Sequence, residues 1–215
     1  MAVRRARLRK LVREVYTLAG RVSRIPWWLE RCWMWVPERW CSMTTINTGA
    51  TLAGSGVLGP VTSLGGNIGP GNSPGILTTG NLNTSAGVTT FNMELNGTAP
   101  GTGYDQVVVN GLIDIGTTSV LSLTSNFVPT PGDKFFLLVN NGSSPITGLF
   151  SGIADNSQFT TVEGYVFEAH YTADSGTGNV SGGNDFALLT IVPEPSGTVL
   201  LALTFVFGVA RRRRK

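Results

Sequence analysis

Few side chains in this sequence are suited to acid–base or metal chemistry. The chain has one histidine, His170, so a histidine-dependent triad or a multi-histidine metal site lacks the residues it needs. Between residues 44 and 210 the only basic side chain is Lys134. A carbohydrate lyase requires a base that abstracts a proton from its substrate, and we therefore expect His170 to be structural and a lyase to be excluded.

Carboxylates offer a second kind of chemistry, because a pair of them can hydrolyse a glycosidic bond. The central region contains aspartates with no evident role: Asp105, Asp114, Asp133 and Asp155. No spacing singles out a pair, so we expect solvated turn residues and no enzyme activity. The segment 176–185 is similar to a calcium-binding Gly-Asp turn but lacks the repeating pattern that stacks such ligands. No metal site and no cofactor are predicted.

Short strands are the elements that would position these groups. From residue 44 to about residue 190, Gly, Thr, Ser and Asn separate short apolar stretches. Val107 and Val109 recur at every second position, as do Leu121 and Leu123, which places their side chains on one face of a strand. This region, 44–191, is therefore predicted to be a β-rich body of half-buried strands joined by tight turns.

Internal similarity indicates how the strands are arranged. Residues 80–95 resemble residues 110–124, and a period of about 20–30 residues favours a solenoid. We predict an all-β fold, either a β-solenoid or a two-sheet β-sandwich, since periodicity alone does not separate the two. Residues 46–124 are repeat-like, whereas the phenylalanine-rich residues 125–191 are predicted to form a more globular cap.

Residues 1–43 form a basic, tryptophan-rich leader. Ten of the 16 basic residues lie between Arg4 and Arg39, and loosely helical apolar spacing predicts a basic amphipathic helix. Charges interrupt every candidate apolar core of a secretory signal. The alternative is that this leader is not native to the body, as when translation is assigned to a start too far upstream. Because the body itself is acidic, no nucleic-acid partner is predicted.

Residues 192–215 have the composition of a membrane tail. Pro193-Glu194-Pro195 ends the strand region, because proline lacks a backbone donor. Residues 196–210 carry no charge, and a helix from Pro195 to Ala210 would span roughly 24 Å of a membrane. Five cationic residues then set the topology: Arg211, Arg212, Arg213, Arg214 and Lys215. They are expected to stay cytoplasmic, which places the body on the non-cytoplasmic side.

The order of these three parts resembles a PEP-CTERM sorting signal. This resemblance implies recognition of Pro193, Glu194 and Pro195 by an exosortase-type transpeptidase, after temporary anchoring through 196–210. It further implies passage through the inner membrane to the cell envelope or the extracellular space. An exopolysaccharide is a candidate partner of the released body.

A second resemblance lies in residues 65–77, GGNIGPGNSPGIL, with Glu94-Leu95-Asn96-Gly97 and Gly103-Tyr104-Asp105-Gln106 downstream. These segments look like the autotransporter-associated β-strand repeat, which implies a right-handed parallel β-helix. Together the two resemblances predict an exported structural or adhesive protein of the envelope or extracellular matrix. The alternative is an exported polysaccharide-active hydrolase built on a β-helix.

Overall fold

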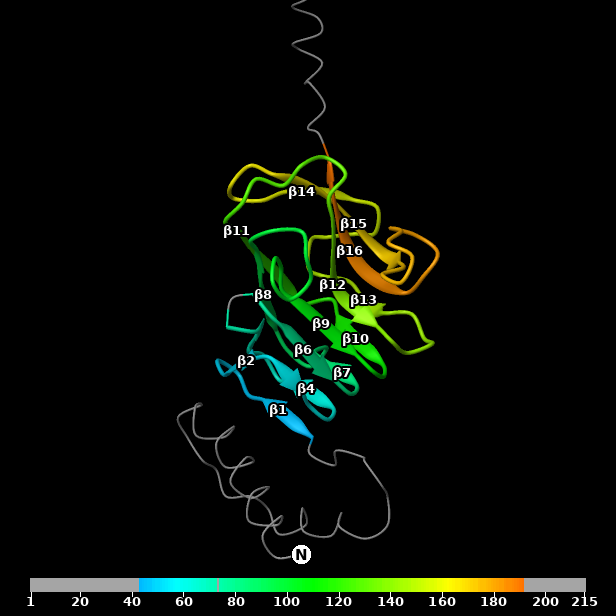
Figure 1. Cartoon of the computed structure of the whole chain (residues 1–215). Coiled ribbons are helices and arrows are strands. Elements are labelled where there is room, and N and C mark those ends of the chain that lie inside the picture. The colour runs from blue at the N-terminus through cyan, green and yellow to red at the C-terminus, as the bar shows by residue number, and fades with distance from the viewer. Residues whose placement is uncertain (1–42, 73, 192–215) are drawn as a thin grey trace, which may run out of the picture.

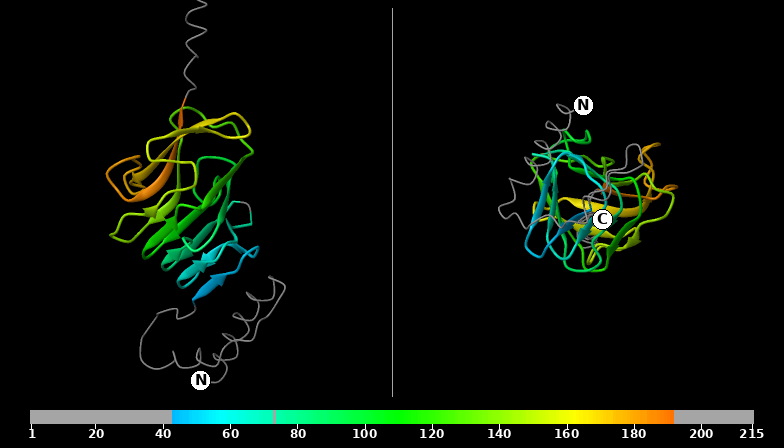
Figure 2. Two further views of the ribbon diagram at one scale, coloured as in Figure 1. Left: turned by 180° about the vertical axis from the view of Figure 1, so that it is seen from behind. Right: turned by 90° about the horizontal axis from the view of Figure 1, so that it is seen from below.

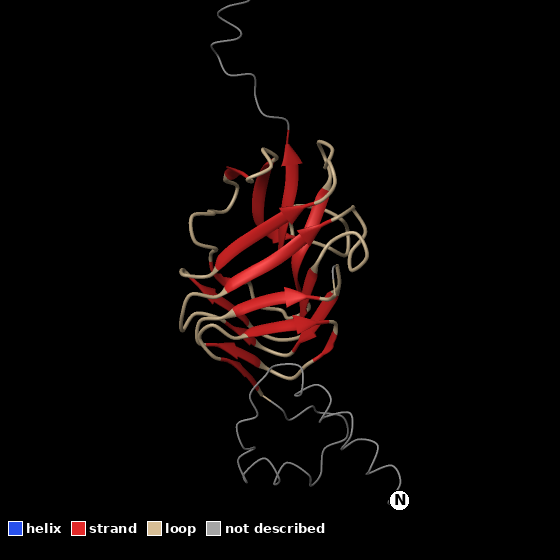
Figure 3. Ribbon diagram, turned by 90° about the vertical axis from the view of Figure 1, so that its left-hand side faces the viewer, coloured by secondary structure: helices blue, strands red, loops and turns tan. Residues whose placement is uncertain are grey.

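The computed structural model describes residues 43–72 and 74–191, and all regular secondary structure within them is β-strand (Figure 3). This confirms the predicted all-β fold of the body. The predicted N-terminal helix and the predicted membrane helix at 196–210 fall in residues 1–42 and 192–215, which lie outside the described residues.

The strands form three sheets. The first sheet contains β1 (Thr44–Ile46), β4 (Val61–Ser63), β7 (Leu82–Asn83), β10 (Ile113–Gly116) and β13 (Thr147–Gly148), in that order. The second contains β2 (Thr51–Gly54), β5 (Asn67–Pro70), β8 (Thr90–Leu95) and β11 (Val120–Ser125). The third contains β3 (Gly56–Val57), β6 (Ile76–Thr79), β9 (Gln106–Val109), β12 (Lys134–Asn140), β16 (Asp185–Ile191), β15 (Val166–Ala173) and β14 (Gln158–Thr160).

From β1 to β13 the chain visits the three sheets in rotation, so that every third strand pairs with its predecessor in parallel. Figure 1 shows these strands stacked from β1 upward, and the right-hand view of Figure 2 shows them surrounding the interior. The spacing between paired residues varies along the stack. Thr51 pairs with Asn67, whereas Asp114 pairs with Thr147, so successive circuits lengthen. In the last of these pairs, β10 with β13, the register shifts between Asp114 and Gly116.

Parallel, in-register pairing places apolar side chains in columns inside the stack. In the first sheet Val61, Leu82 and Ile113 lie directly above one another, and all three are buried. The other two sheets have equivalent columns: Leu52, Ile68, Phe91 and Leu121 in the second, and Leu77, Val107 and Leu138 in the third. These columns supply the hydrophobic core because each circuit buries its side chains against the next.

The last strands depart from the parallel pattern and close one end of the stack. β12 pairs with β16, β16 with β15, and β15 with β14, all antiparallel. Phenylalanine side chains fill the space beneath them, with the Phe150 ring 5.0 Å from that of Phe186 and 5.2 Å from that of Phe91, between ring centroids. Edge-to-face pairs of this kind add to the stabilisation from burial, and here they join β16 to the second sheet.

Candidate functional site

Residues 70–72 and 74–75 belong to the corner between β5 and β6. Gly71 has a φ of +76°, in the left-handed region that strongly favours glycine. Its amide donates to the Gly54 carbonyl at 2.8 Å. A Cβ atom on Gly71 would overlap the backbone of Gly75, and one on Gly75 would overlap Gly71. Both glycines are therefore needed for the chain to turn this tightly before it enters β6.

Asp105 fastens this corner to β8. Its Oδ1 accepts a hydrogen bond from the Gly75 amide at 2.7 Å, and its Oδ2 accepts one from the Glu94 amide at 2.9 Å. Asp105 is only 2% exposed. Burial raises the pKa of its carboxyl, because the charged form is disfavoured away from water, and the nearby Glu94 carboxylate adds to this effect. The two amide hydrogen bonds lower the pKa of Asp105 instead, and they hold the carboxylate in place.

A hollow of about 290 Å³ opens beside Asp105 on the second sheet. Its polar lining includes Asn72, Asn92, Glu94 and Thr124. Amide and hydroxyl groups of this kind can bind a ligand rich in hydroxyls, and two carboxylates in different environments can divide the roles of acid and base. Because both Asp105 oxygens already accept backbone hydrogen bonds, the hollow is better suited to binding than to proton transfer.

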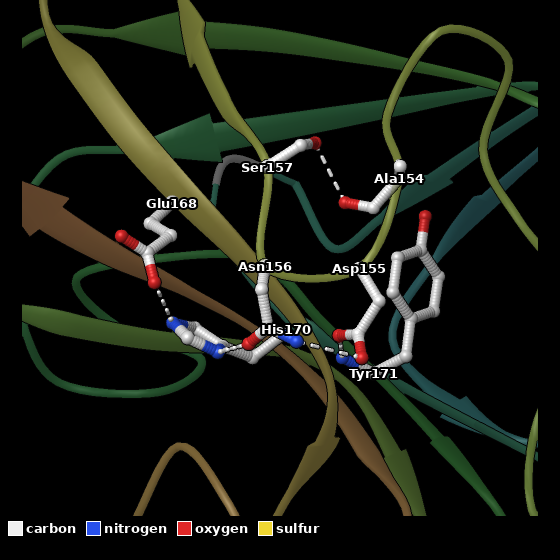
Figure 4. Close-up of polar contacts among 7 residues, drawn as sticks. All are labelled: Ala154, Asp155, Asn156, Ser157, Glu168, His170 and Tyr171. Carbon is white, nitrogen blue, oxygen red and sulfur yellow. Dashed lines mark hydrogen bonds and ion pairs between the residues drawn. The ribbon is translucent and has the colours of Figure 1, made fainter.

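The only histidine of the chain lies in a second polar cluster, on β15 (Figure 4). His170 Nδ1 is 3.1 Å from Asn156 Oδ1, and the imidazole is 8% exposed. Its Nε2 is 3.3 Å from Glu168 Oε1, close enough for an ion pair when the ring is protonated but without the alignment of a hydrogen bond. Asn156 has a φ of 54° and its amide donates to Ala169 O at 2.7 Å. His170 therefore helps to hold a strained turn against β15.

Tyr171, on the inner side of β15, also ties the preceding loop to this strand through hydrogen bonds. Its hydroxyl donates to the Ile153 carbonyl at 3.0 Å and accepts from the Phe150 amide at 2.9 Å. Its own amide donates to Asp155 Oδ1 at 2.9 Å. Burial raises the pKa of Tyr171 to about 12. These contacts give Tyr171 a structural role and not that of a nucleophile or a general base.

The aspartates left unassigned by the sequence all accept backbone hydrogen bonds. Besides Asp105, the pairs are Asp114 with Gly116, Asp133 with Thr130, and Asp155 with Tyr171. The sequence predicts solvated turn acids, which is wrong for Asp105, because its carboxylate is buried between the β5–β6 corner and β8. Each of the other three carboxylates accepts an amide of a specific turn or strand. Carboxylates engaged with amides are more strongly fixed than solvated ones.

The Gly-Asp segment at 176–185 is organised in the same way. Asp174 Oδ1 accepts from the Gly176 amide at 3.0 Å, and Asp185 Oδ1 accepts from the Asn140 amide at 2.6 Å. Within residues 43–72 and 74–191, no group of three or more His, Cys, Asp or Glu side chains could hold a metal ion. Asp185, the acidic residue of this segment, is therefore held by a backbone amide from β12, and Asp174 just before the segment is held by a local one.

The residues predicted to direct sorting are in another part of the chain. Pro193, Glu194 and Pro195, and the cationic end from Arg211 to Lys215, lie outside the described residues. Across the described ranges, no helix is long and apolar enough to span a membrane. Comparison of the chain with protein-family models, with curated proteins and with solved structures returns no match.

Sequence reasoning named Glu94 and Asp105 but did not bring them together. They flank the loop at residues 96–104, whose ends are tied by the Asn96 amide donating to the Gly103 carbonyl at 2.6 Å. This loop returns the chain to the end of β8, so that residues 11 positions apart line one hollow. The Asn-Gly pair at 96–97 was the available signal, because it predicts a turn at this point.

Proposed function

We propose that this chain is an exported, non-enzymatic structural or adhesive protein of the cell envelope or extracellular matrix. Its body is proposed to be a right-handed parallel β-helix. The rotation of β1 to β13 through three sheets, with parallel pairing in each, supports this assignment over a β-sandwich, whose sheets are built from antiparallel strands. Stacks of this kind are elongated and present long, repetitive surfaces, which suits adhesion or matrix formation.

The observation that carries the non-enzymatic proposal is the state of the titratable side chains. Three of the polar groups that could act as acid or base hold turns: the Asp105 and Asp155 carboxylates accept amides, and His170 lies between Asn156 and Glu168. A catalytic group has to reach its substrate as well as its orienting partners. The arrangement serves the stability of the body.

Delivery is proposed to depend on the tail. An exosortase-type transpeptidase recognises Pro193, Glu194 and Pro195, while 196–210 anchors the chain in the inner membrane and Arg211–Lys215 remain cytoplasmic. Cleavage near the Pro-Glu-Pro motif then releases the body to the envelope or to an exopolysaccharide matrix. The charge asymmetry across 196–210 supports this orientation.

The proposal is tested by the intact mass of the exported protein, isolated from envelope and secreted fractions of cells that carry the processing enzyme. A mass lacking the Arg211–Lys215 end is expected. A protein found outside the inner membrane with that end intact would contradict temporary anchoring.

A second candidate function, polysaccharide hydrolysis, is favoured by one observation. Glu94 and Asp105 line the same hollow, beside Asn92 and Thr124, which could bind sugar hydroxyls. Glycan cleavage by the purified protein would support it if Glu94→Gln abolished the activity and Glu168→Gln, a carboxylate on β15, did not. Glycan binding without cleavage would favour the adhesive function instead.

A further inference from the structure

The first circuit of the stack leaves one end of the body open. Its strands β1, β2 and β3 are each the terminal strand of a sheet, and each pairs with the second circuit, through β4, β5 and β6. Among the described residues no further strand pairs with their outer edges. We call this surface, made by residues 44–58, the open end. Figure 1 shows it at β1, opposite the end of the stack that β14, β15 and β16 close.

The outer edge of β1 presents backbone groups that β4 does not pair. The Thr44 amide donates to the Pro60 carbonyl, and the Ile46 carbonyl accepts from the Leu64 amide, both at 2.8 Å. Because alternate residues of a parallel strand bond to the same neighbour, the amide and carbonyl of Thr45 point away from β4. The same alternation turns outward the backbone groups of exposed residues in the other two strands: Thr51, Ala53 and Val57. A strand edge of this kind can bind another strand.

Apolar side chains of the core are incompletely covered at the open end. Leu52 is only partly buried, whereas Ile68 and Phe91, in the same column, are each 1% exposed. Leu58 also packs against the core while it remains partly exposed. A further layer of strands would cover both leucines, and the apolar area removed from water would stabilise the contact.

The open end lacks the residues that usually prevent strand edges from associating. Soluble proteins protect such edges with charged side chains or with proline, but residues 43–58 contain neither. No charged residue occurs anywhere between positions 43 and 93. When two identical surfaces meet, each charge is brought near its own copy, and like charges in an interface are costly. The uncharged open end is therefore compatible with itself.

A second copy of the chain supplies the matching partner. Another open end presents three strand edges in the same arrangement, whereas the far end of the body is closed by the antiparallel strands β14, β15 and β16. Head-to-tail growth into a fibre is therefore not expected. From the outward backbone groups, the partly covered leucines and the absence of charge, we infer that two copies join by their open ends as a two-fold dimer. The two-fold axis reverses the direction of the circuits, so the edges meet as antiparallel strands.

This dimer would give adhesion a specific form. The described chain ends with β16 at the closed end of the stack, away from β1 (Figure 1). The closed ends of the two copies would therefore face in opposite directions, so that chains displayed on two facing surfaces could join them. This consequence rests on the proposed adhesive function, whereas the dimer itself does not.

Photo-cross-linking of the purified full-length chain in detergent micelles tests the dimer. In one variant p-benzoylphenylalanine replaces Thr51, which is exposed on the edge strand β2. In the control variant it replaces Val162, which is fully exposed between β14 and β15 at the closed end. Each variant is prepared as a mixture of isotopically labelled and unlabelled chains, because cross-linked peptides that combine the two identify contacts between copies.

We expect about tenfold more cross-linking between copies from position 51 than from position 162, with the products at residues 44–58 of the second copy. Thr45→Lys combined with Ala53→Lys places like charges across the interface and should lower this yield about tenfold. The matched pair Val88→Lys and Leu112→Lys adds the same charge at exposed positions outside the open end, and it should leave the yield unchanged.

Three results would overturn the dimer: equal yields between copies from positions 51 and 162, cross-links from position 51 confined to residues 1–42, or a yield that the lysines at 45 and 53 do not change. Association of the tails within micelles would raise the yields at both positions alike and would not produce the expected difference. Loss of the tail in cells is measured separately, so that a dimer without processing and processing without a dimer are distinguished.

Discussion

Replacing Asp105 by asparagine tests the proposed corner most sharply. The carboxylate is 2% exposed and accepts the amides of Gly75 and Glu94 at 2.7 and 2.9 Å. Asparagine keeps one acceptor oxygen but turns its NH₂ group toward the second amide, which leaves that donor unpaired. A buried donor without a partner costs about 1–3 kcal/mol, so we expect Asp105→Asn to lower the free energy of unfolding by about 2 kcal/mol near neutral pH.

The matched control is Asp114→Asn. Asp114 accepts one amide, that of Gly116 at 3.0 Å, at a less buried position in β10, so a loss of about 0.5–1 kcal/mol is expected. Unfolding by urea is followed by circular dichroism, and hydrogen exchange at Gly75 and Glu94 reports the corner directly. Equal stability losses in the two variants, or unchanged exchange at both amides in Asp105→Asn, would refute the assigned role of Asp105.

The pH dependence of the same variant gives an independent check. Burial raises the folded-state pKa of Asp105 above its ordinary value of 3.8, so the folded state binds this proton more tightly than the unfolded state. The part of the stability that depends on the Asp105 proton is therefore complete below pH 3.8 and is lost as the pH rises through the raised pKa, while the contribution of the two amide hydrogen bonds remains. Asp105→Asn should lack this decline. A stability difference between wild type and variant that grows with rising pH would contradict the assignment.

Three further substitutions, the first with a matched control, test the body. Leu82→Ala removes a buried member of the first-sheet column and should cost about 2–5 kcal/mol of unfolding free energy, whereas Leu112→Ala, at a side chain 60% exposed, should change it by about 0.5 kcal/mol or less. Gly71→Ala should destabilise by more than about 1 kcal/mol, because of the positive φ and the close approach of Gly75; a neutral effect on the thermal midpoint would refute the close turn. Tyr171→Phe should cost about 1–3 kcal/mol near neutral pH. Because burial raises the pKa of Tyr171 from 10.0 to about 12, the stability of the wild type should fall as pH rises through that interval and the Tyr171→Phe protein should lack this loss.

The sequence predicts the strands better than it predicts their partners. The alternation at Val107 and Val109 gives a strand with both side chains buried, as expected. The internal similarity of residues 80–95 and 110–124 reflects direct pairing, since Leu82 lies beside Ile113 and the following strands are also in register. Local periodicity carries this information because each circuit repeats the same alternation of inward and outward side chains.

The sheet order and the polar contacts depend on loop lengths that periodicity does not contain. Circuits lengthen along the stack, so a fixed period does not identify which strands pair. The proximity of Glu94 and Asp105 requires the path of the loop at 96–104, and the antiparallel pairing of β15 with β16 requires the turn at residues 174–184. Likewise the contact of His170 with Asn156 joins residues 14 positions apart through a turn with a positive φ. These features become visible only when the chain is folded.

Delivery by the tail is the central claim of the proposed function, and the intact mass of the exported body tests it most directly. The wild type and a Pro193→Ala, Pro195→Ala variant are produced in cells that contain an exosortase-type enzyme, and each protein is purified from the membrane, envelope and secreted fractions. The wild type outside the inner membrane is expected to lack the apolar run and the Arg211–Lys215 end, while the variant remains in the membrane at full length. Wild-type protein that reaches the envelope with its cationic end intact, or identical masses and distributions for the two proteins, would contradict the claim.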